Sequence, residues 1–430
     1  MASSCWEIIL ASTSEGPITA YDADTGTLLA CFSNNSRSSP CKGLALAGKT
    51  MIATSHISNA CYTICLYHWC SSAPFRHLPI PEPIAPLTAT IDGSYLFCGG
   101  LSGQIHVLSL PSGNVFRSFP IHSRPISCLT INVEGDGSLL ISGGDDGVIA
   151  ILPIIKLLDV NARLEDNSSD SQLTLHKFVA HPLSITAIAV SPCSCISTIV
   201  SCSLDCTCKF WSLASGTHLR TVRFPCVIWC VAMDPTMWEF YAGGSDGKVY
   251  VGELKVVSRR KWFSRMRDEE TGVVAWAEEH NGAITALALV DYGRCLVSAS
   301  EDGSMKMWDV ECGRVIRVVE QERSSTIRDL VVAKGVRSSR GVVGIGSNDG
   351  YAMQHGEIEG FSGREVARRR RPVKEVMEME ECLAEVVKDR RRAVDTLEAS
   401  IATYERLLTL FLNEAKGGHS SKEETKNGSS

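Results

Sequence analysis

A short segment recurs along this chain of 430 residues, and this repetition constrains the fold more than any other feature. The segment SCSLDCTCKFW at 201–211 aligns position for position with SASEDGSMKMW at 298–308. Because a repeated segment of this kind is one structural unit that packs against its copies, repeats have to be placed before domains are assigned. Weaker copies of the segment occur at 100–110, 142–152, 243–254 and 346–353.

The spacing of the copies gives the size of the structural unit. Aspartates in successive polar turns are separated by 59, 41, 56 and 47 residues. The two longest intervals contain insertions, at about 153–173 and 254–271, so the basic repeat is about 41 to 44 residues long. These aspartates are Asp146, Asp205, Asp246, Asp302 and Asp349.

Each repeat has the pattern of short strands joined by turns. An alternating apolar run such as ITAIAV at 185–190 precedes a second run such as CLVSAS at 295–300, an Asp-Gly turn and a third run. A fourth run follows a Ser-Gly or Thr-Gly pair. Four antiparallel strands per repeat make one blade of a β-propeller, so we expect an all-β propeller over residues 1–360. The small pairs stand at 25–26, 112–113, 215–216 and 271–272.

The innermost strands indicate seven blades, with eight as the alternative. The segments that begin the chain, EIILAST, PITAYD and TLLACF, lack an innermost strand of their own. We expect the strand near Ile327 to join them, so that the two ends of the chain close the ring. The strands in VVGIGSNDGYAM at 342–353 would then be left over or would replace part of the first set. The candidate innermost strands begin near Leu44, Leu87, Ile126, Ile185, Ile228, Ile284 and Ile327.

The sequence changes in character after about residue 363, where a charged, helix-favouring run extends to Ala415. We predict a separate helix over 364–415 and a disordered tail over 416–430. The apolar positions of the predicted helix alternate in steps of four and three residues, which is typical of a parallel two-stranded coiled coil. In a homodimer Arg390 would face its own copy, so it either points outward or meets a carboxylate of a partner helix. The seam positions are Leu383, Val387, Arg390, Val394, Leu397, Ile401, Tyr404, Leu408 and Phe411.

The composition is that of an ordinary folded protein, with 44% hydrophobic residues, 21% charged residues and a formal net charge of -6. These values exclude disorder over most of the chain and argue against a surface that binds nucleic acid everywhere. The amino terminus lacks a basic region and a long apolar run, so we expect neither a signal peptide nor a membrane span. In a reducing compartment the 18 cysteines act as small hydrophobic strand residues, and we expect no structural disulfides.

No sequence pattern favours catalysis or a bound cofactor. The string GLALAGKT at 43–50 satisfies the phosphate-loop pattern, but a strand-like segment follows it instead of a helix, so we predict a blade hairpin. Cys202, Cys206 and Cys208 lack the paired spacing of a zinc site, and the repeat alignment puts them at packing and turn positions. No nucleophile elbow, HExxH motif or pair of catalytic carboxylates stands out. We therefore expect no cofactor, no metal and no enzymatic activity.

Two basic segments are suited to contacts with partners. The insertion SRRKWFSRMR at 258–267 suits phosphate contact with base stacking, or an acidic protein, and a solvated loop is the alternative. The run ARRRRPVKE at 367–375 is typical of a nuclear-import signal, with a solvated helix start as the alternative. The residues concerned are Arg259, Arg260, Lys261, Trp262, Arg265 and Arg267 in the insertion and Arg368, Arg369, Arg370 and Arg371 in the run.

Two of the repeats carry residues by which the chain resembles the WD40 repeat proteins. The resemblance implies that a histidine, a strand serine, an aspartate and a tryptophan form one hydrogen-bonded chain in each of these blades. Buried indole, hydroxyl and imidazole groups each need such a partner. Elsewhere Leu152 and Gly252 replace the tryptophan, so those blades must depend more on apolar packing. The matching residues are His181, Asp205 and Trp211 in one blade and His280, Asp302 and Trp308 in another.

Within this family the chain is similar to ribosome-biogenesis proteins of the Root Initiation Defective Three type, counterparts of the WD-repeat subunit of the Rix complex. The likeness rests on residues 222–254, on the blade that contains His181 and on the carboxyl-terminal coil. It implies a non-enzymatic scaffold in the nucleolus and nucleoplasm that helps mature pre-60S particles, supports spacer removal from precursor rRNA and works with a midasin-type AAA ATPase. Roles in cell proliferation and in plant meristem and root development would follow from this role in ribosome assembly. A substrate receptor of a ubiquitin ligase, or an adaptor of a chromatin complex, is the alternative.

Overall fold

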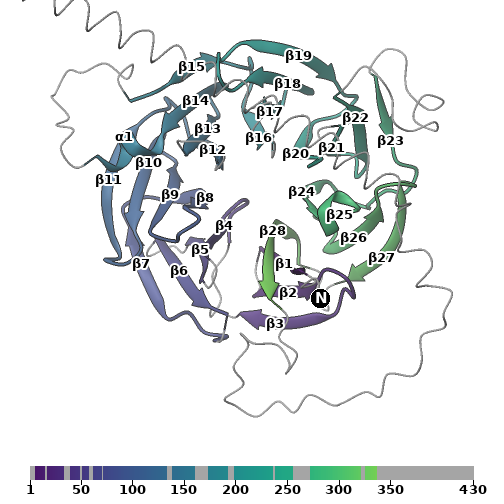
Figure 1. The fold of residues 1–430 in the computed structure, drawn as a ribbon, viewed down its shortest axis with the longest axis horizontal. Coiled ribbons are helices and arrows are strands. Elements are labelled where there is room, and N and C mark those ends of the chain that lie inside the picture. The colour runs from purple at the N-terminus through teal and green to yellow at the C-terminus, as the bar shows by residue number, and fades with distance from the viewer. Residues whose placement is uncertain are drawn as a thin grey trace, which may run out of the picture. The chain divides into compact units, whose positions relative to one another are not determined.

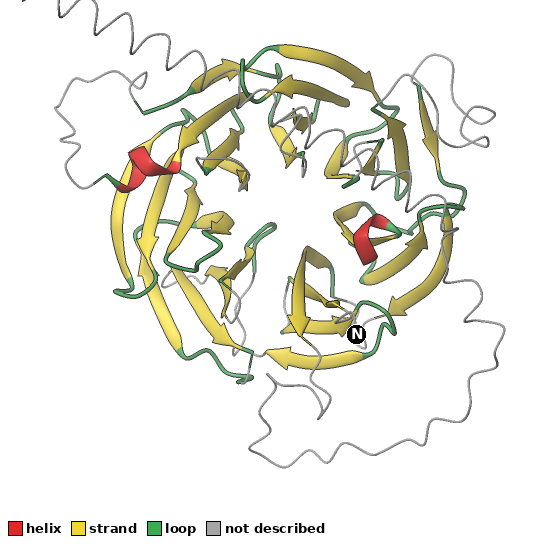
Figure 2. Ribbon diagram, in the orientation of Figure 1, coloured by secondary structure: helices red, strands yellow, loops and turns green. Residues whose placement is uncertain are grey.

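The computed structural model describes twelve segments of the chain, and within them the strands form seven four-stranded antiparallel sheets. All of the described residues belong to the unit Met1–Gly350. Figures 1 and 2 show the sheets as blades around a common axis, with one strand of each blade facing the centre. The described segments are residues 5–14, 17–32, 39–48, 51–57, 62–69, 71–132, 138–159, 173–191, 198–235, 238–254, 272–320 and 325–336.

Six blades consist of four consecutive strands, ordered from the innermost to the outermost strand. Blade 1 has β4 (Leu44–Ala47), β5 (Met51–Ile57), β6 (Tyr62–His68) and β7 (Arg76–Ile80), and blade 2 has β8 (Ile84–Ala89), β9 (Tyr95–Gly100), β10 (Gln104–Ser109) and β11 (Asn114–Pro120). Blade 3 has β12 (Ile126–Asn132), β13 (Leu139–Gly144), β14 (Val148–Pro153) and β15 (His176–Val179), and blade 4 has β16 (Ile185–Val190), β17 (Thr198–Ser203), β18 (Thr207–Ser212) and β19 (His218–Arg223). Blade 5 has β20 (Ile228–Met233), β21 (Glu239–Gly244), β22 (Val249–Glu253) and β23 (Val273–Ala275), and blade 6 has β24 (Ile284–Val290), β25 (Cys295–Ser300), β26 (Ser304–Asp309) and β27 (Arg314–Glu320).

Blade 7 combines the two ends of the described chain. Its innermost strand is β28 (Ile327–Val336), and it continues with β1 (Cys5–Thr13), β2 (Ile18–Asp22) and β3 (Leu28–Phe32). The antiparallel register of β1 and β28 pairs Ile8 with Ala333 and Leu10 with Val331. The innermost strands contact one another in order, and β28 also contacts β4, so the ring is closed. The sequence-based prediction of seven blades closed by the Ile327 strand is confirmed, and the alternative of eight is wrong for the described residues.

The hydrophobic core lies between neighbouring blades. The second strand of each blade is covered on both faces, and every residue of β17 and β21 is buried. One apolar cluster joins Val200 of blade 4 to Phe240 of blade 5, and another joins Tyr241 of blade 5 to Trp308 of blade 6. The outermost strands face solvent, as in β19, where only Val222 is buried. Each blade therefore buries its apolar residues against the next one, which explains why the repeats stabilise one another.

The predicted strand starts agree with the structure except in blade 2. Six of the seven innermost strands begin at the predicted residue, but β8 begins at Ile84 and not near Leu87. Pro86 lies inside this strand, and the pairing of β8 with β9 is irregular between Ile84 and Leu87. The first insertion begins with a short helix, α1 (Ile154–Leu158), and a 3-10 turn (Asp291–Gly293) joins β24 to β25. Neither described helix has the length or apolar character that crossing a bilayer requires.

Candidate functional site: the polar networks and the inner rim

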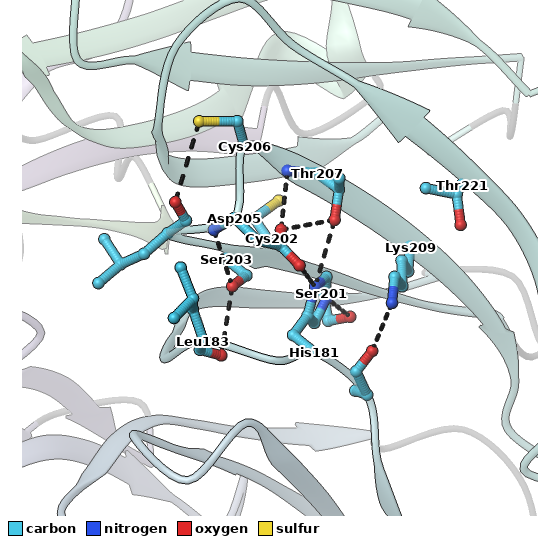
Figure 3. A network of polar contacts seen from close by, with 12 residues as sticks. His181, Leu183, Ser201, Cys202, Ser203, Asp205, Cys206, Thr207, Lys209 and Thr221 are labelled. Atoms are coloured by element: carbon cyan, nitrogen blue, oxygen red, sulfur yellow. Dashed lines mark hydrogen bonds and ion pairs between the residues drawn. The ribbon is translucent and has the colours of Figure 1, made fainter.

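In blade 4 a buried histidine joins the loop before β16 to two strands, as Figure 3 shows. His181 Nδ1 lies 2.9 Å from Asp205 Oδ2 in the turn between β17 and β18. His181 Nε2 lies 2.9 Å from Ser201 Oγ on β17, and the same oxygen accepts the indole N–H of Trp211 at 2.9 Å. The structure thus brings His181, Asp205 and Trp211 together around Ser201.

The protonation of His181 sets the direction of these hydrogen bonds. Burial lowers its pKa by more than Asp205 raises it, so the imidazole is neutral at pH 7. Because Nδ1 faces a carboxylate it carries the proton, and Nε2 then accepts the Ser201 hydroxyl proton. Burial alone would raise the pKa of Asp205, but hydrogen bonds from Thr207 and His181 outweigh it and keep that pKa below its usual value. Each donor in this network therefore has one acceptor.

Blade 6 repeats the network, with Ser304 at the position that Thr207 holds in blade 4. Ser298 Oγ lies 2.7 Å from His280 Nε2 and accepts the Trp308 indole N–H at 2.7 Å. On the other side of the ring, Ser304 Oγ lies 3.0 Å from His280 Nδ1 and donates to Asp302 Oδ1 at 2.7 Å. Asp302 Oδ2 is 3.5 Å from His280 Nδ1, so Ser304 relays most of this contact. Burial lowers the pKa of His280 to about 4.

Blade 3 keeps the histidine but lacks the tryptophan. His122 Nδ1 lies 3.1 Å from Asp146 Oδ1, and His122 Nε2 lies 2.8 Å from Ser142 Oγ. Leu152 takes the position of the tryptophan and is buried in an apolar cluster. Ser142 therefore lacks the indole N–H that Ser201 and Ser298 accept, and apolar packing replaces that hydrogen bond.

Blade 2 has an inverted network that the sequence reasoning missed. The carboxylate comes from the loop before β8, where Glu82 Oε1 lies 2.6 Å from His106 Nε2 on the third strand. His106 Nδ1 lies 2.7 Å from Ser118 Oγ, and Glu82 also accepts the N–H and the hydroxyl of Ser102. Burial would raise the pKa of Glu82, but the hydrogen bonds from Ser102 and His106 outweigh it and lower that pKa. This network could have been predicted from the sequence by a glutamate just before the innermost strand and a histidine on the third strand of the same repeat.

Blade 5 replaces the network with a tyrosine. Asp246 Oδ2 accepts the hydroxyl of Tyr250 at 2.6 Å, and Cys226 stands beside both residues. Gly252 takes the tryptophan position because the ring of Phe240 fills that space: a Cβ on Gly252 would come within 2.2 Å of the Phe240 ring. Sequence reasoning identified Asp246 and Gly252 but not Tyr250 or Phe240, which lie on different strands of the blade.

These networks are buried and hold the turns at one end of blades 2, 3, 4 and 6. The four network histidines, His106, His122, His181 and His280, are only 2%, 6%, 1% and 3% exposed. A polar group buried in this way costs about 1–3 kcal/mol when its partner is lost, so complete pairing specifies the turn geometry.

A second set of contacts joins neighbouring blades at the inner rim, which we define as the first residues of the innermost strands. In three blades a small bulge there points a hydroxyl at the next blade. Ser127 donates to Ile185 O at 2.5 Å, Thr186 to Ile228 O at 2.5 Å and Thr285 to Ile327 O at 2.8 Å. In blades 5 and 7 the corresponding bulge residues are Trp229 and Arg328, which carry no hydroxyl.

Lys42 reaches across the axis of the ring at this rim. It lies between blades 7 and 1 with φ of 58°, and its ammonium donates to Thr186 O of blade 4 and to Ser127 O of blade 3. Asp329 joins the closing blade to blade 1, since its Oδ2 accepts the Leu44 N–H at 3.2 Å. Although part of Asp329 is exposed, its carboxyl group is withdrawn from solvent, and this burial raises its pKa to about 7.

The remaining sequence-based candidates have these positions. The string at 43–50 spans β4 and the start of the hairpin to β5. Cys202 and Cys208 are buried opposite each other on β17 and β18, and Cys206, with φ of 59°, takes the turn position that Gly303 occupies with φ of 82°. The basic insertion at 258–267, the basic run at 368–371 and the seam residues from 383 to 411 lie outside the described residues.

Comparisons with known proteins agree with this geometry. Residues 113–151, 172–212 and 274–309 match the family model described as "WD domain, G-beta repeat". Among solved structures, the computationally designed Ika8 protein has the same type of fold, with a TM-score of 0.52 and 20% identity over 78% of this chain and 92% of that chain.

Three relatives connect the chain to characterised proteins. It is 28% identical to human WD repeat-containing protein 18 over 56% of this chain and 53% of the relative, so it spans about half of that protein. It is 24% identical to the Schizosaccharomyces pombe pre-rRNA-processing protein crb3/ipi3 over 71% of this chain and 72% of the relative. It is 34% identical to Arabidopsis thaliana Protein ROOT INITIATION DEFECTIVE 3 over 74% of this chain and 69% of the relative. Identity at this level over more than two thirds of the Arabidopsis protein, on a ring of seven blades, means that this chain belongs to the Root Initiation Defective 3 family of WD40 repeat proteins.

Proposed function

We propose that this protein is a non-catalytic scaffold subunit of a nuclear complex that matures pre-60S particles and supports spacer removal from precursor rRNA. The observation that carries the proposal is the match to the fission yeast pre-rRNA-processing protein over 72% of that protein's length, alongside the match to the Arabidopsis relative. The buried histidines support a non-catalytic role, because their hydrogen-bonding atoms are used to hold turns. The partners in this proposal are subunits of a Rix-like complex and a midasin-type AAA ATPase, in the nucleolus and nucleoplasm.

Two segments outside the described residues complete the proposal. The heptad pattern over 364–415 forms a homodimer and anchors the propeller within the complex. The basic insertion at 258–267 contacts rRNA or an acidic protein, and the arginines at 368–371 direct nuclear import. Effects on plant meristem and root development follow from impaired ribosome assembly.

Co-sedimentation tests the assembly role. Nuclear extract that contains the tagged protein is fractionated on a sucrose gradient and probed for spacer-containing precursor rRNA. We expect the protein in large-subunit precursor fractions, and depletion of the protein should increase unprocessed spacer rRNA. Confinement to light fractions at several salt concentrations, together with cullin or histone partners, would instead assign the protein to a ubiquitin ligase or a chromatin complex.

The dimer is tested separately by light scattering of the full chain. A charge at a seam position, Val394→Glu, should yield a monomer, because it places two carboxylates against each other in the seam. Thr396→Glu adds the same charge outside the seam pattern and should leave the dimer intact. A Val394→Glu protein that stays dimeric would refute the coiled-coil assignment.

A further inference from the structure

The inner rim departs from its own repeating pattern at two positions. Where blades 3, 4 and 6 place a hydroxyl that binds the next blade, blade 5 places Trp229 and blade 7 places Arg328. Neither side chain has a hydroxyl that could donate to a carbonyl of the next blade as Ser127 does. The Trp229 side chain is 40% exposed. Figure 1 shows that β20, β28 and β4, which carry or adjoin these residues, all face the centre of the ring. In three other blades the residue at this position is held by a hydrogen bond to the next blade. An exposed tryptophan there needs a role other than blade packing.

Among the described residues, the positive charges at this rim form no close ion pair, although the Lys42 ammonium acts electrostatically on the Asp329 carboxyl. The Arg328 guanidinium lies 3.3 Å from Cys41 Sγ, next to Lys42 in the chain. The Lys42 ammonium donates to the carbonyl oxygens of Ser127 and Thr186. Within the described part of the chain, neither cation forms an ion pair with Asp or Glu. Asp329, the acid closest in the chain to Arg328, accepts the backbone N–H groups of Leu44 and Leu330.

Apart from Asp329, the acidic residues considered on the same face stand further from the axis. Each innermost strand begins at the end of the blade where the turn between the second and third strands lies, because the strands are antiparallel. Exposed Asp246 and Glu301 lie in those outer turns, and exposed Glu279 precedes β24 and pairs with Lys248. The face therefore has the two cations and the Asp329 carboxyl at its centre, with further carboxylates around them, and the raised pKa of Asp329, about 7, leaves the centre net positive at pH 7. A local positive centre inside an acidic border attracts a short acidic segment and repels a continuous polyanion such as RNA.

We propose that the inner rim formed by Lys42, Trp229 and Arg328 binds an acidic segment of a partner protein. Its carboxylates pair with the Arg328 guanidinium and the Lys42 ammonium, and an apolar side chain of the segment packs on the exposed face of Trp229. The inference concerns this rim alone and holds or fails independently of the ribosome-assembly role.

Fluorescence anisotropy of the full-length protein tests the proposal. The probe is a fluorescein-labelled hexaglutamate peptide with one central phenylalanine, and labelled oligouridylate of similar length is the comparison. We expect Arg328→Gln and Lys42→Gln each to raise the dissociation constant of the peptide about fivefold, and Trp229→Ala to raise it about threefold. Lys177→Gln is the matched control, since it removes an exposed cation from the outermost strand β15 and should leave binding unchanged.

Each other outcome overturns the inference. An equal rise of the peptide's dissociation constant in Lys177→Gln would mean that the peptide binds through net charge alone. If the wild-type protein does not bind the peptide, the proposed site does not exist. Stronger binding of oligouridylate with the same dependence on Arg328 and Lys42 would assign the rim to nucleic acid. Thermal unfolding of every variant shows whether a lost signal comes from a lost fold, and Arg328→Gln serves as the decisive variant if Lys42→Gln does not fold.

Discussion

The cost of removing the central serine of a polar network depends on how many buried partners it leaves unpaired. Ser201→Ala deprives both the imidazole of His181 and the indole N–H of Trp211 of their partner. At about 1–3 kcal/mol for each buried polar group left unsatisfied, this change should lower the free energy of unfolding by about 2–5 kcal/mol. Ser142→Ala deprives only His122, because Leu152 stands where the tryptophan would be, so it should cost about 1–3 kcal/mol.

Urea denaturation at pH 7.5, followed by circular dichroism, measures both variants against the wild-type protein. Both serines are fully buried on the second strand of a blade, so the substitutions are matched in size and position. The expected difference between Ser201→Ala and Ser142→Ala is therefore the contribution of the indole hydrogen bond, about 1–2 kcal/mol. Equal destabilisation, or a larger loss in Ser142→Ala, would refute the argument that Trp211 is bound through Ser201.

Three further predictions concern single positions. Burial lowers the pKa of His280 to about 4 in the folded protein, whereas a histidine in the unfolded chain has a pKa of about 6.5. The unfolded state therefore takes up a proton first, and the free energy of unfolding should fall as the pH drops from 6.5 to 4. Between pH 7.5 and 5.0 this loss should be about 2 kcal/mol smaller in His280→Gln than in wild type, and parallel pH profiles would contradict the prediction. Gly252→Ala should destabilise the protein by about 1–3 kcal/mol in urea denaturation, because its Cβ would collide with the ring of Phe240, and a neutral result would show that this ring moves freely. Cys206→Gly should raise the thermal midpoint, because it removes about 1 kcal/mol of left-handed backbone strain at a turn where the sister repeat has Gly303, and an unchanged or lower midpoint would show that the thiol contributes more than the strain costs.

The fold could be predicted because the blades repeat the same local pattern. Polar turns and apolar runs recur with a fixed order, so six innermost strands could be located to the residue. Ring closure was also predictable, since the amino-terminal segments contain three strands and the Ile327 strand lacked partners. The start of β8 could not be located because Pro86 lies inside the strand and its irregular pairing with β9 is visible only in the structure.

The polar groups were predictable only where the repeat is well preserved. His181 and His280 stand at matching positions of two similar segments, which points to their shared partners. The pair of Glu82 and His106 could not be found in this way, because the roles of loop and strand are exchanged in that blade. The contact of Lys42 with Thr186 joins residues on opposite sides of the ring, 144 positions apart, and no local pattern encodes it.

The way the ring closes also determines the order in which the protein can be completed during synthesis. The strand β1 leaves the ribosome before its partner β28, which follows only after more than 300 residues, a delay of about 15–60 s at 5–20 residues per second. During that time the edge of β1 exposes unpaired N–H and C=O groups next to apolar residues such as Ile9, which is a surface prone to pairing with other chains. The non-local pairing also makes closure a late and slow event. A nascent chain of this protein therefore depends on protection of β1 until β28 arrives.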